Sequence, residues 1–302
     1  MSSIKQNHVL SIQSTVVCGY VGNKCASFAL QVHGFDFSPI NSVQLSNHTG
    51  YKFIKGQVLD ADDVDCLYEG LKQNNIHNQF SHLLTGYIGS KSFLLKVGDI
   101  IQDVKDSNPG IVYVCDPVMG DNGKLYVPED LLPVYKDVII PKADIVTPNQ
   151  FEAELLTDMK ISNEADALLA MQRLLDKGPR TVVLSSTNLG SNGKLVALAC
   201  SVKNGTKECY RIEMPYLDAI FVGTGDLFAA CLLAWMQKDS DLKSALEKTV
   251  STVQTVIHRT LQAAKEVAGS ETPTPAQMEL RLMQSKADIE NPKINFTAQK
   301  IS

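Results

Sequence analysis

A glycine-rich turn followed directly by a carboxylate is the part of the sequence best suited to chemistry. Gly223, Thr224, Gly225 and Asp226 stand in succession, and an apolar helical run follows over residues 226–235. Glycines let backbone N–H groups approach a ligand closely, and the first turn of a helix leaves N–H groups unpaired at the positive end of its dipole. The turn therefore predicts an anion site, with Asp226 as a general base for a hydroxyl group that attacks a phosphoryl group.

Taken alone, the same four residues are also compatible with a plain turn in which Asp226 caps a helix. Phe228 stands where a dinucleotide fingerprint has its third glycine, and no Gly-x-x-x-x-Gly-Lys-Ser/Thr loop occurs in the chain. The sequence thus disfavours a Rossmann dehydrogenase and a Walker-type nucleotidase. A functional interpretation depends on the other groups that converge on this turn.

Length and composition are those of a globular protein. The 302 residues are 44% hydrophobic and 20% charged, with a formal net charge of −5, which argues against nucleic acid or an anionic membrane as the main partner. The sequence shows no signal-peptide pattern and no apolar run near the roughly 18 residues of a membrane span, so we expect a cytoplasmic protein. The seven cysteines are scattered without a Cys-x-x-Cys pair, and we expect reduced thiols.

Strand-like and helical patterns alternate along the chain, as in βα units around a mainly parallel sheet. Strands are predicted at residues 9–12, 38–43, 82–85, 111–115, 145–147, 181–185 and 195–200. Helices are predicted at residues 62–74, 91–106, 150–157, 163–177, 226–237, 242–268 and 276–289. No repeat or linker divides the chain. We therefore expect one three-layer α/β/α domain over residues 1–302, with a short lid loop at 121–126 and a C-terminal tail at 291–302.

Polar residues follow several predicted strands, at the edge where open parallel sheets bind their ligands. They are Ser14, Asp116, Asp121, Thr147, Asn149, Glu152, Ser185 and Ser186. Each alone is compatible with an ordinary turn, helix cap or loop position. Their succession on consecutive strand ends favours a site for phosphates together with Mg²⁺ or a monovalent cation, because hard cations prefer oxygen ligands.

In the order of these motifs the chain resembles the eukaryotic pyridoxal kinases of the ribokinase superfamily, almost from end to end. The matching stretches are residues 10–14, 19–23, 41–51, 84–87, 113–118, 126–131, 147–155 and 221–226. The resemblance implies a ribokinase-like fold and ATP-dependent phosphorylation of the 5′-hydroxymethyl group of pyridoxal, pyridoxine or pyridoxamine. It also implies Mg²⁺ as Mg-ATP, a monovalent cation such as K⁺ or Na⁺, and a homodimer. The lid loop is shorter than in vertebrate members.

The resemblance further implies a role for each matched residue. Asp226 is the expected base, and Gly223, Thr224 and Gly225 form the expected anion hole with it. The vitamer is expected to contact Ser14, Thr49, Val21, Val43 and Tyr87. The nucleotide is expected to contact Asp116, Asn149, Gln150, Phe151, Glu152, Ser185, Ser186, Leu217, Asp218, Ala219 and Thr224. Cations are expected at Asp121, Thr147 and Glu152.

Two alternatives stay open. A hydroxymethylpyrimidine kinase would share the fold, the base and the anion hole, but the stretches around Ser14 and Thr49 argue against it. A non-catalytic vitamer-binding protein on the same fold is disfavoured because a pure binder does not need Asp226.

Overall fold

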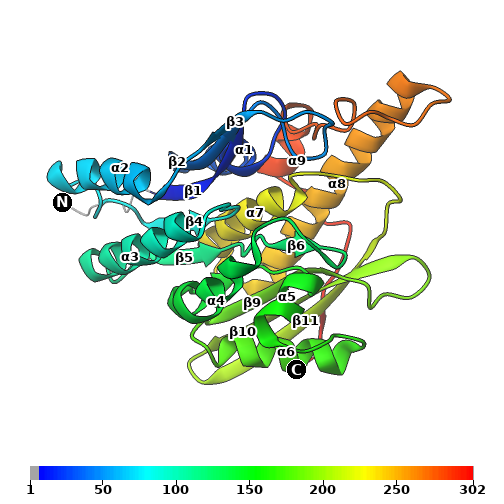
Figure 1. Cartoon of the computed structure of the whole chain (residues 1–302). Helices are drawn as coiled ribbons and strands as arrows, with labels where there is room; N and C mark the ends of the chain where they lie inside the picture. Colours follow the sequence, from blue (N-terminus) through cyan, green and yellow to red (C-terminus); the bar gives the residue numbers. More distant parts are fainter. Residues whose placement is uncertain (1–6, 302) are drawn as a thin grey trace.

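The computed structural model describes residues 7–301, which fold around one ten-stranded sheet (Figure 1). Its strand order is β12-β11-β10-β9-β8-β5-β4-β1-β2-β3. The strands are β1 (His8–Val16), β2 (Asp36–Leu45), β3 (Gly56–Val58), β4 (His82–Thr85), β5 (Val112–Cys115), β8 (Ile145–Val146), β9 (Thr181–Thr187), β10 (Lys194–Lys203), β11 (Thr206–Pro215) and β12 (Gln299–Lys300). A separate hairpin consists of β6 (Gly120–Asp121) and β7 (Lys124–Leu125).

The centre of the sheet is parallel, as predicted. Strands β2, β1, β4, β5, β8 and β9 run in one direction, whereas β3 at one end and β10, β11 and β12 at the other are antiparallel to their neighbours. The carboxyl ends of the six parallel strands therefore lie along one edge of the sheet. Polar residues that follow these strands are brought to the same side of the molecule.

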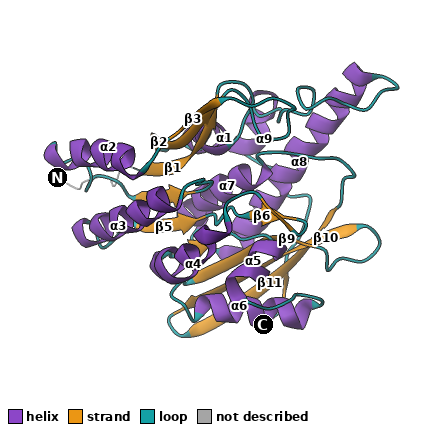
Figure 2. Ribbon diagram, viewed as in Figure 1, coloured by secondary structure: helices purple, strands orange, loops and turns teal. Residues whose placement is uncertain are grey.

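Helices cover both faces of the sheet (Figure 2). One face carries α1 (Gly22–Val32), α7 (Thr224–Asp239), α8 (Leu242–Ala268) and α9 (Lys286–Glu290), and the other carries α2 (Ala61–Gln73), α3 (Lys91–Ser107), α4 (Leu132–Val134), α5 (Gln150–Thr157) and α6 (Glu164–Leu175). Strand side chains alternate between the two layers. In β5, Tyr113 and Cys115 pack in the core under α2–α6, and Val114 packs in the core under α1, α7 and α8. The three-layer α/β/α prediction is confirmed.

The structure differs from the predicted elements near the C-terminus. The helix predicted at 276–289 is replaced by turns, a short 3₁₀ helix (Met283–Ser285) and α9. Apolar side chains of this stretch, among them Leu280 and Leu282, are buried against the core without helical periodicity. The expected tail at 291–302 contains β12, which pairs with β11 through Tyr210 and Lys300, so part of it belongs to the sheet.

One pair of cysteines corrects the expectation of reduced thiols. Cys200 in β10 and Cys209 in β11 stand directly opposite each other and form a disulfide. The hairpin between the two strands brings these residues together, a proximity that their spacing in the sequence does not reveal. The other five cysteines are free. Among residues 7–301, no helix combines the length and the apolarity that crossing a bilayer requires.

Candidate active site

The predicted anion hole lies at the start of α7, at the carboxyl edge of the sheet. Gly223 precedes the helix with φ +92, and among the described residues no side chain caps the helix there. A Cβ on Gly223 would collide with the Tyr20 carbonyl oxygen, so glycine is required for both its conformation and its close packing. The first N–H groups of α7 have no partner within the helix and are free to bind an anion.

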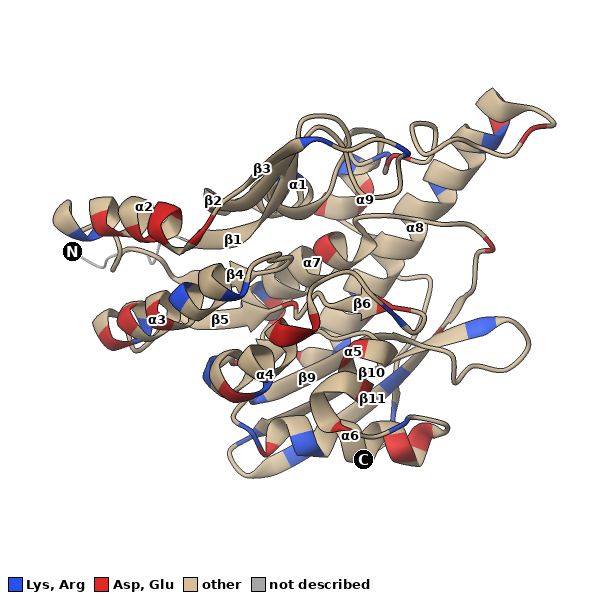
Figure 3. Ribbon diagram, viewed as in Figure 1, with Lys and Arg blue, Asp and Glu red and all other residues tan. Residues whose placement is uncertain are grey.

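Asp226 is the acidic residue in the first turn of α7; Figure 3 shows in red how acidic residues are distributed over the fold. Its Oδ2 accepts the backbone N–H of Gly22 at 2.7 Å. Burial raises the pKa of Asp226 to about 6, and the Gly22 N–H opposes this rise. A carboxylate with this pKa is ionised near neutral pH and basic enough to accept a proton, which suits a general base.

Gly22, to which the sequence analysis gave no role, connects Asp226 with the end of β1. It has φ +52, and a Cβ there would collide with the Ser14 carbonyl oxygen. Ser14 lies at an irregularity in the pairing of β1 with β2 and is buried. Ser14, Gly22 and Asp226 thus form one contiguous corner of the site. The signal in the sequence was a second glycine, close behind Gly19, in the short connection between a strand and a helix.

A second group of carboxylates lies beside the anion hole. Asp116 follows β5, is 4% exposed, and its Oδ1 accepts the Thr147 hydroxyl at 3.1 Å. Its Oδ2 lies 3.5 Å from the position that a Cβ on Gly225 would take. Burial raises the pKa of Asp116 well above its usual range, and the negative charges of Glu152 and Asp226 raise it further. The three carboxyl groups of Asp116, Glu152 and Asp226 thus lie close together without enough positive charge to balance them.

Glu152 holds the turn before the lid hairpin against the start of α5. Its Oε1 accepts the N–H groups of Met119 at 2.9 Å and Gly120 at 3.4 Å, and its Oε2 accepts that of Asn149 at 2.9 Å. Burial raises the pKa of Glu152 to about 7, against the effect of these three hydrogen bonds. The Asn149 amide also donates to the Gly120 carbonyl at 2.8 Å. Glu152 and Asn149 therefore both bind the backbone at the start of the predicted lid.

The predicted lid is a β-hairpin. Gly120 and Asp121 pair with Lys124 and Leu125, and the Asp121 carboxylate accepts the N–H of Asn122 at 2.8 Å. Burial raises the pKa of Asp121. In the described part of the chain no three His, Cys, Asp or Glu side chains are grouped as a complete metal site. The donor set of buried oxygens still fits a cation whose remaining ligands are water or phosphate oxygens.

The other residues predicted on the nucleotide side lie around α5 and before α7. The Gln150 side chain accepts the Asn188 N–H and donates to the Ile161 carbonyl, both at 2.9 Å. The Phe151 ring lies 2.8 Å from where a Cβ on Gly120 would stand. The remaining six are Ser185 and Ser186 near the end of β9, Leu217, Asp218 and Ala219 in the connection from β11 to α7, and Thr224 at the first position of α7.

The residues predicted on the vitamer side come from β1, from β2 and from the loops that follow β2 and β4 or precede α1. Val43 is buried in β2, and Thr49 is exposed in the loop that joins β2 to β3. The Tyr87 carbonyl accepts the Ser42 hydroxyl at 2.6 Å, and burial raises the pKa of Tyr87. Val21 precedes α1, and its Cγ1 lies 3.3 Å from the Cβ position of Gly223.

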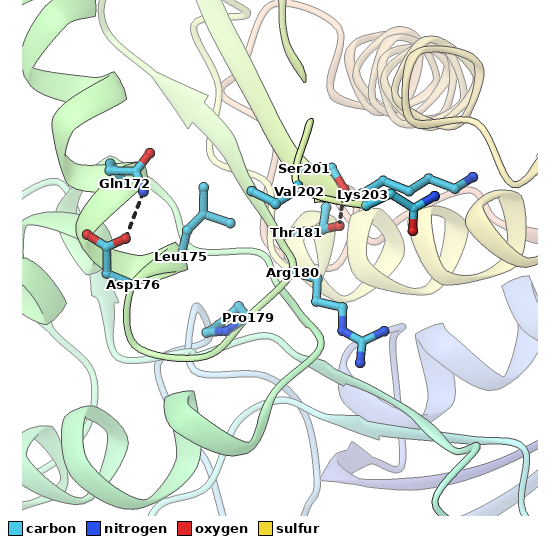
Figure 4. Close-up of a pocket in the computed structure, with 11 residues that line it drawn as sticks. Gln172, Leu175, Asp176, Pro179, Arg180, Thr181, Ser201, Val202 and Lys203 are labelled. Carbon is cyan, nitrogen blue, oxygen red and sulfur yellow. Dashed lines mark hydrogen bonds between the residues drawn. The ribbon is translucent and has the colours of Figure 1, made fainter. Parts of the chain in front are cut away.

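A separate cavity of about 690 Å³ lies away from this site (Figure 4). It is lined by residues of α6, the start of β9 and the β10–β11 hairpin, including Arg180 and Lys203. The hydroxyl groups of two lining residues, Thr181 in β9 and its strand partner Ser201 in β10, share a hydrogen bond of 2.9 Å. Because Thr181 is at the amino end of β9, this cavity is at the opposite edge of the sheet from Ser185.

Known proteins resemble the chain over nearly its whole length. A family model described as phosphomethylpyrimidine kinase matches residues 42–270. The pyridoxal kinase of Sus scrofa is 55% identical over 95% of this chain and 94% of its own length. That of Arabidopsis thaliana is 48% identical over 97% and 94%. The solved structure of Leishmania donovani pyridoxal kinase in complex with ADP and pyridoxine matches at a TM-score of 0.91 and 34% identity, covering 98% of this chain and 100% of that one.

Proposed function

Because the chain belongs to the pyridoxal kinase family, we propose that it transfers the γ-phosphoryl group of ATP to the 5′-hydroxymethyl group of pyridoxal, pyridoxine and pyridoxamine. The observation that carries this proposal is the position of Asp226, with a pKa of about 6, in the first turn of α7 beside unpaired N–H groups. A base and an anion site then serve the same transfer. We place this reaction in vitamin B6 salvage in the cytoplasm.

In the reaction, the vitamer hydroxyl attacks the γ-phosphorus of ATP, and its proton passes to Asp226. The bond from the γ-phosphorus to the bridging oxygen breaks, and ADP leaves. The N–H groups of Gly223, Thr224 and Gly225 at the start of α7 stabilise charge on the transferred oxygens. Ser14 and Thr49 hydrogen-bond the pyridine ring, with Val21, Val43 and Tyr87 lining its pocket.

On the nucleotide side, polar residues near the carboxyl ends of β5 and β9 and at the starts of α5 and α7 face the phosphates. These are Asp116, Asn149, Gln150, Glu152, Ser185, Ser186 and Thr224, with Phe151, Leu217, Asp218 and Ala219 nearby. Asp121, Thr147 and Glu152 would supply oxygens to Mg²⁺ and a monovalent cation, and Glu152 retains one lone-pair site beyond its three N–H partners. The bound cations would neutralise the negative charge of the phosphates and of the neighbouring carboxylates. The hairpin over residues 121–126 is the proposed lid that excludes water.

A hydroxymethylpyrimidine kinase is the nearest alternative, because the matching family model carries a related description. That model begins at residue 42 and leaves out the stretch that contains Ser14, Val21 and Gly22, whereas the pyridoxal kinases match over 94–97% of the chain. Mg-ATP-dependent phosphorylation of the three vitamers and of hydroxymethylpyrimidine, measured side by side, distinguishes the two. Turnover of the vitamers supports the proposal, and turnover of hydroxymethylpyrimidine alone overturns it.

The pH dependence of the reaction should report Asp226. Its pKa of about 6 means that the carboxylate is ionised above this pH and protonated below it. We expect kcat/KM for pyridoxal to fall about tenfold per pH unit below about 6, because protonated Asp226 cannot accept the hydroxyl proton. Rates measured from about pH 5 to pH 8 test this. A profile that stays flat down to the lower limit would contradict it.

Asp116→Asn should stabilise the free protein and impair nucleotide use. Burial beside Glu152 and Asp226 raises the pKa of Asp116 well above its usual range, so this carboxyl group opposes folding near neutral pH, and its replacement by a neutral amide is expected to raise the free energy of unfolding by about 1 kcal/mol. The asparagine oxygen can still accept the Thr147 hydroxyl. KM for Mg-ATP should rise about tenfold, because the site loses a carboxylate that helps to hold the cations bound to the phosphates.

Denaturant unfolding without nucleotide and steady-state kinetics measure the two effects of Asp116→Asn. Asp137→Asn, which neutralises an exposed carboxylate, is the matched control and should change neither quantity. Reduced stability together with an unchanged KM for Mg-ATP would show that Asp116 has a purely structural role.

We also propose a homodimer, formed through apolar side chains near the β3 end of the sheet. Val17, Phe53 and Val58 are 69%, 77% and 62% exposed, and Ile54, which follows Phe53 in the chain, is 37% exposed. Clustered exposed apolar residues are typical of protein interfaces. Sedimentation of the native chain and of Phe53→Ser tests this assignment: a native dimer weakened by the substitution supports it, and an unweakened dimer or a native monomer overturns it.

A further inference from the structure

A carboxylate remote from the catalytic residues in sequence, Glu279, joins two loops on the vitamer side of the site. It lies between α8 and α9 and is 14% exposed. Its Oε1 accepts the Tyr51 hydroxyl at 2.9 Å and lies 3.3 Å from His48 Nε2, and its Oε2 accepts the Tyr20 N–H at 3.2 Å. Three donors from two separate loops therefore meet on one side chain.

The partners of His48 indicate which of its nitrogens carries the proton. Its Nδ1 accepts the Gly50 N–H at 3.1 Å, so Nε2 is the protonated nitrogen and donates to Glu279. His48 is 6% exposed, and its ring packs edge-on against Tyr51 with centroids 4.8 Å apart. Burial raises the pKa of Glu279, but the hydrogen bonds from His48, Tyr51 and Tyr20 outweigh burial and lower it overall. Glu279 is thus an ionised acceptor for His48, Tyr51 and Tyr20. We call these four residues the Glu279 junction, because they join two loops.

One side of this junction leads to the catalytic base. Glu279 binds the N–H of Tyr20, whose carbonyl packs against Gly223. Two residues after Tyr20, the Gly22 N–H donates to Asp226 at 2.7 Å. Leu280, next to Glu279, lies 3.3 Å from the Cβ position of Gly223. The connection 19–22 is therefore held between Glu279 and the start of α7.

The other side of the junction leads to the proposed vitamer contact. Thr49 lies between His48 and Tyr51, the two side chains that donate to Glu279. Gly50 in the same loop packs 3.6 Å from Val222, measured from the position of its Cβ. Thr49 is exposed, but its loop is anchored on both sides of Thr49 by one partly buried carboxylate, that of Glu279.

We propose that Glu279 is a positioning residue for the phosphoryl transfer. It sets the distance between the Thr49 loop and the connection 19–22, so that a vitamer held by Thr49 presents its hydroxyl to Asp226. This inference rests on the proposed kinase function and assigns a role to a residue that contacts neither reacting group. It predicts that damage at Glu279 affects the vitamer more than the nucleotide, because most of the proposed nucleotide contacts lie near β5, β9 and α5, and only those at the start of α7 adjoin the segment that Glu279 holds.

Glu279→Gln is the primary test. Glutamine keeps the size of the side chain, but its NH₂ group donates and cannot accept, so at least one of the three donors loses its partner. We expect KM for pyridoxal and the dissociation constant of pyridoxal to rise about tenfold. KM for ATP should stay within about twofold of the native value. Glu271→Gln, an exposed glutamate before the same segment, is the matched control and should behave as the native chain does.

Tyr51→Phe keeps the test decisive if Glu279→Gln folds poorly. It removes one donor and leaves the carboxylate with its bonds to His48 and Tyr20. It should also raise KM for pyridoxal, and in the double variant the two effects should be less than additive, because both substitutions act on the same hydrogen-bonded group. Melting temperatures of all variants separate loss of fold from loss of positioning.

The outcomes distinguish this inference from the proposed function. If the native chain binds pyridoxal but does not phosphorylate it, the kinase proposal fails, whereas the dissociation constant of pyridoxal still reports on Glu279. If the native chain is active and both variants keep the native pyridoxal affinity and KM, Glu279 has no positioning role. An equal loss of pyridoxal and ATP affinity would also overturn the inference, since general destabilisation would then explain it.

Discussion

Asp226→Asn is expected to lower kcat by about 10³-fold, while the affinity for Mg-ATP stays within about threefold of the native value. Asparagine keeps the shape of the side chain, and its oxygen can still accept the Gly22 N–H that now bonds Asp226 at 2.7 Å. What is lost is the capacity to take the hydroxyl proton, which matters only as the new bond forms. Steady-state kinetics and nucleotide binding measured on the same preparation test the prediction.

Asp137→Asn, the exposed control introduced above, should retain the native kcat. A native kcat in Asp226→Asn would remove Asp226 from the role of base. A loss of nucleotide affinity as large as the loss of kcat would instead show that the substitution disrupts the start of α7.

The second large effect is expected for Gly223→Ala, with kcat lowered at least about 10²-fold and stability lowered by about 2 kcal/mol. Gly223 has φ +92, and an added Cβ would collide with the Tyr20 carbonyl oxygen and meet Val21 and Leu280 at 3.3 Å. The chain must shift to relieve this contact. Such a shift moves both the N–H groups that face the phosphoryl oxygens and the connection that holds Asp226.

Gly205→Ala separates the cost of backbone conformation from the cost of the collision. Gly205 has φ +78 in the β10–β11 hairpin, and no described atom lies within 4 Å of its Cβ position. It should lose about 1 kcal/mol of stability through its conformation and keep full activity. If Gly223→Ala loses no more activity than Gly205→Ala, the start of α7 is not the anion hole.

The elements that the sequence predicts well are those with strong internal patterns. The helix predicted at 242–268 coincides with α8, whose apolar residues recur with helical periodicity, and the strand predicted at 82–85 coincides with β4, which is buried along its length. β11 was missed because polar and apolar residues are mixed along it and several of its positions are exposed or half-buried. Asn204 and Gly205, at φ 51 and 78, form a hairpin turn that pointed to it.

α1 was missed for a different reason. It opens on Gly22, a poor helix residue, and among the described residues no side chain caps it. Tertiary packing against α7 and the sheet, which buries Cys25, Ala26, Ala29 and Leu30, stabilises this helix instead. A single sequence carries little information on such packing.

The local parts of the site were predictable, and its long-range parts were not. Glycine followed by a carboxylate at a helix start marks Asp226, and polar residues at strand ends mark Asp116 and Thr147, because both are short patterns tied to known geometry. The hydrogen bonds that Met119 donates to Glu152 and Tyr20 donates to Glu279 join residues 33 and 259 positions apart in the sequence. No sequence pattern encodes such pairs, since they exist only once the fold has placed their elements together.

The most direct test of the proposed function follows the phosphoryl group itself. The native chain is incubated with pyridoxal and Mg-ATP that carries an isotopic label in its γ-phosphoryl group, and the products are analysed by mass spectrometry. We predict that the label appears in pyridoxal 5′-phosphate and that its formation is strongly reduced in Asp226→Asn. Label found only in inorganic phosphate, or pyridoxal that binds and is recovered unchanged, would contradict a pyridoxal kinase and indicate a nucleotide hydrolase or a vitamer-binding protein.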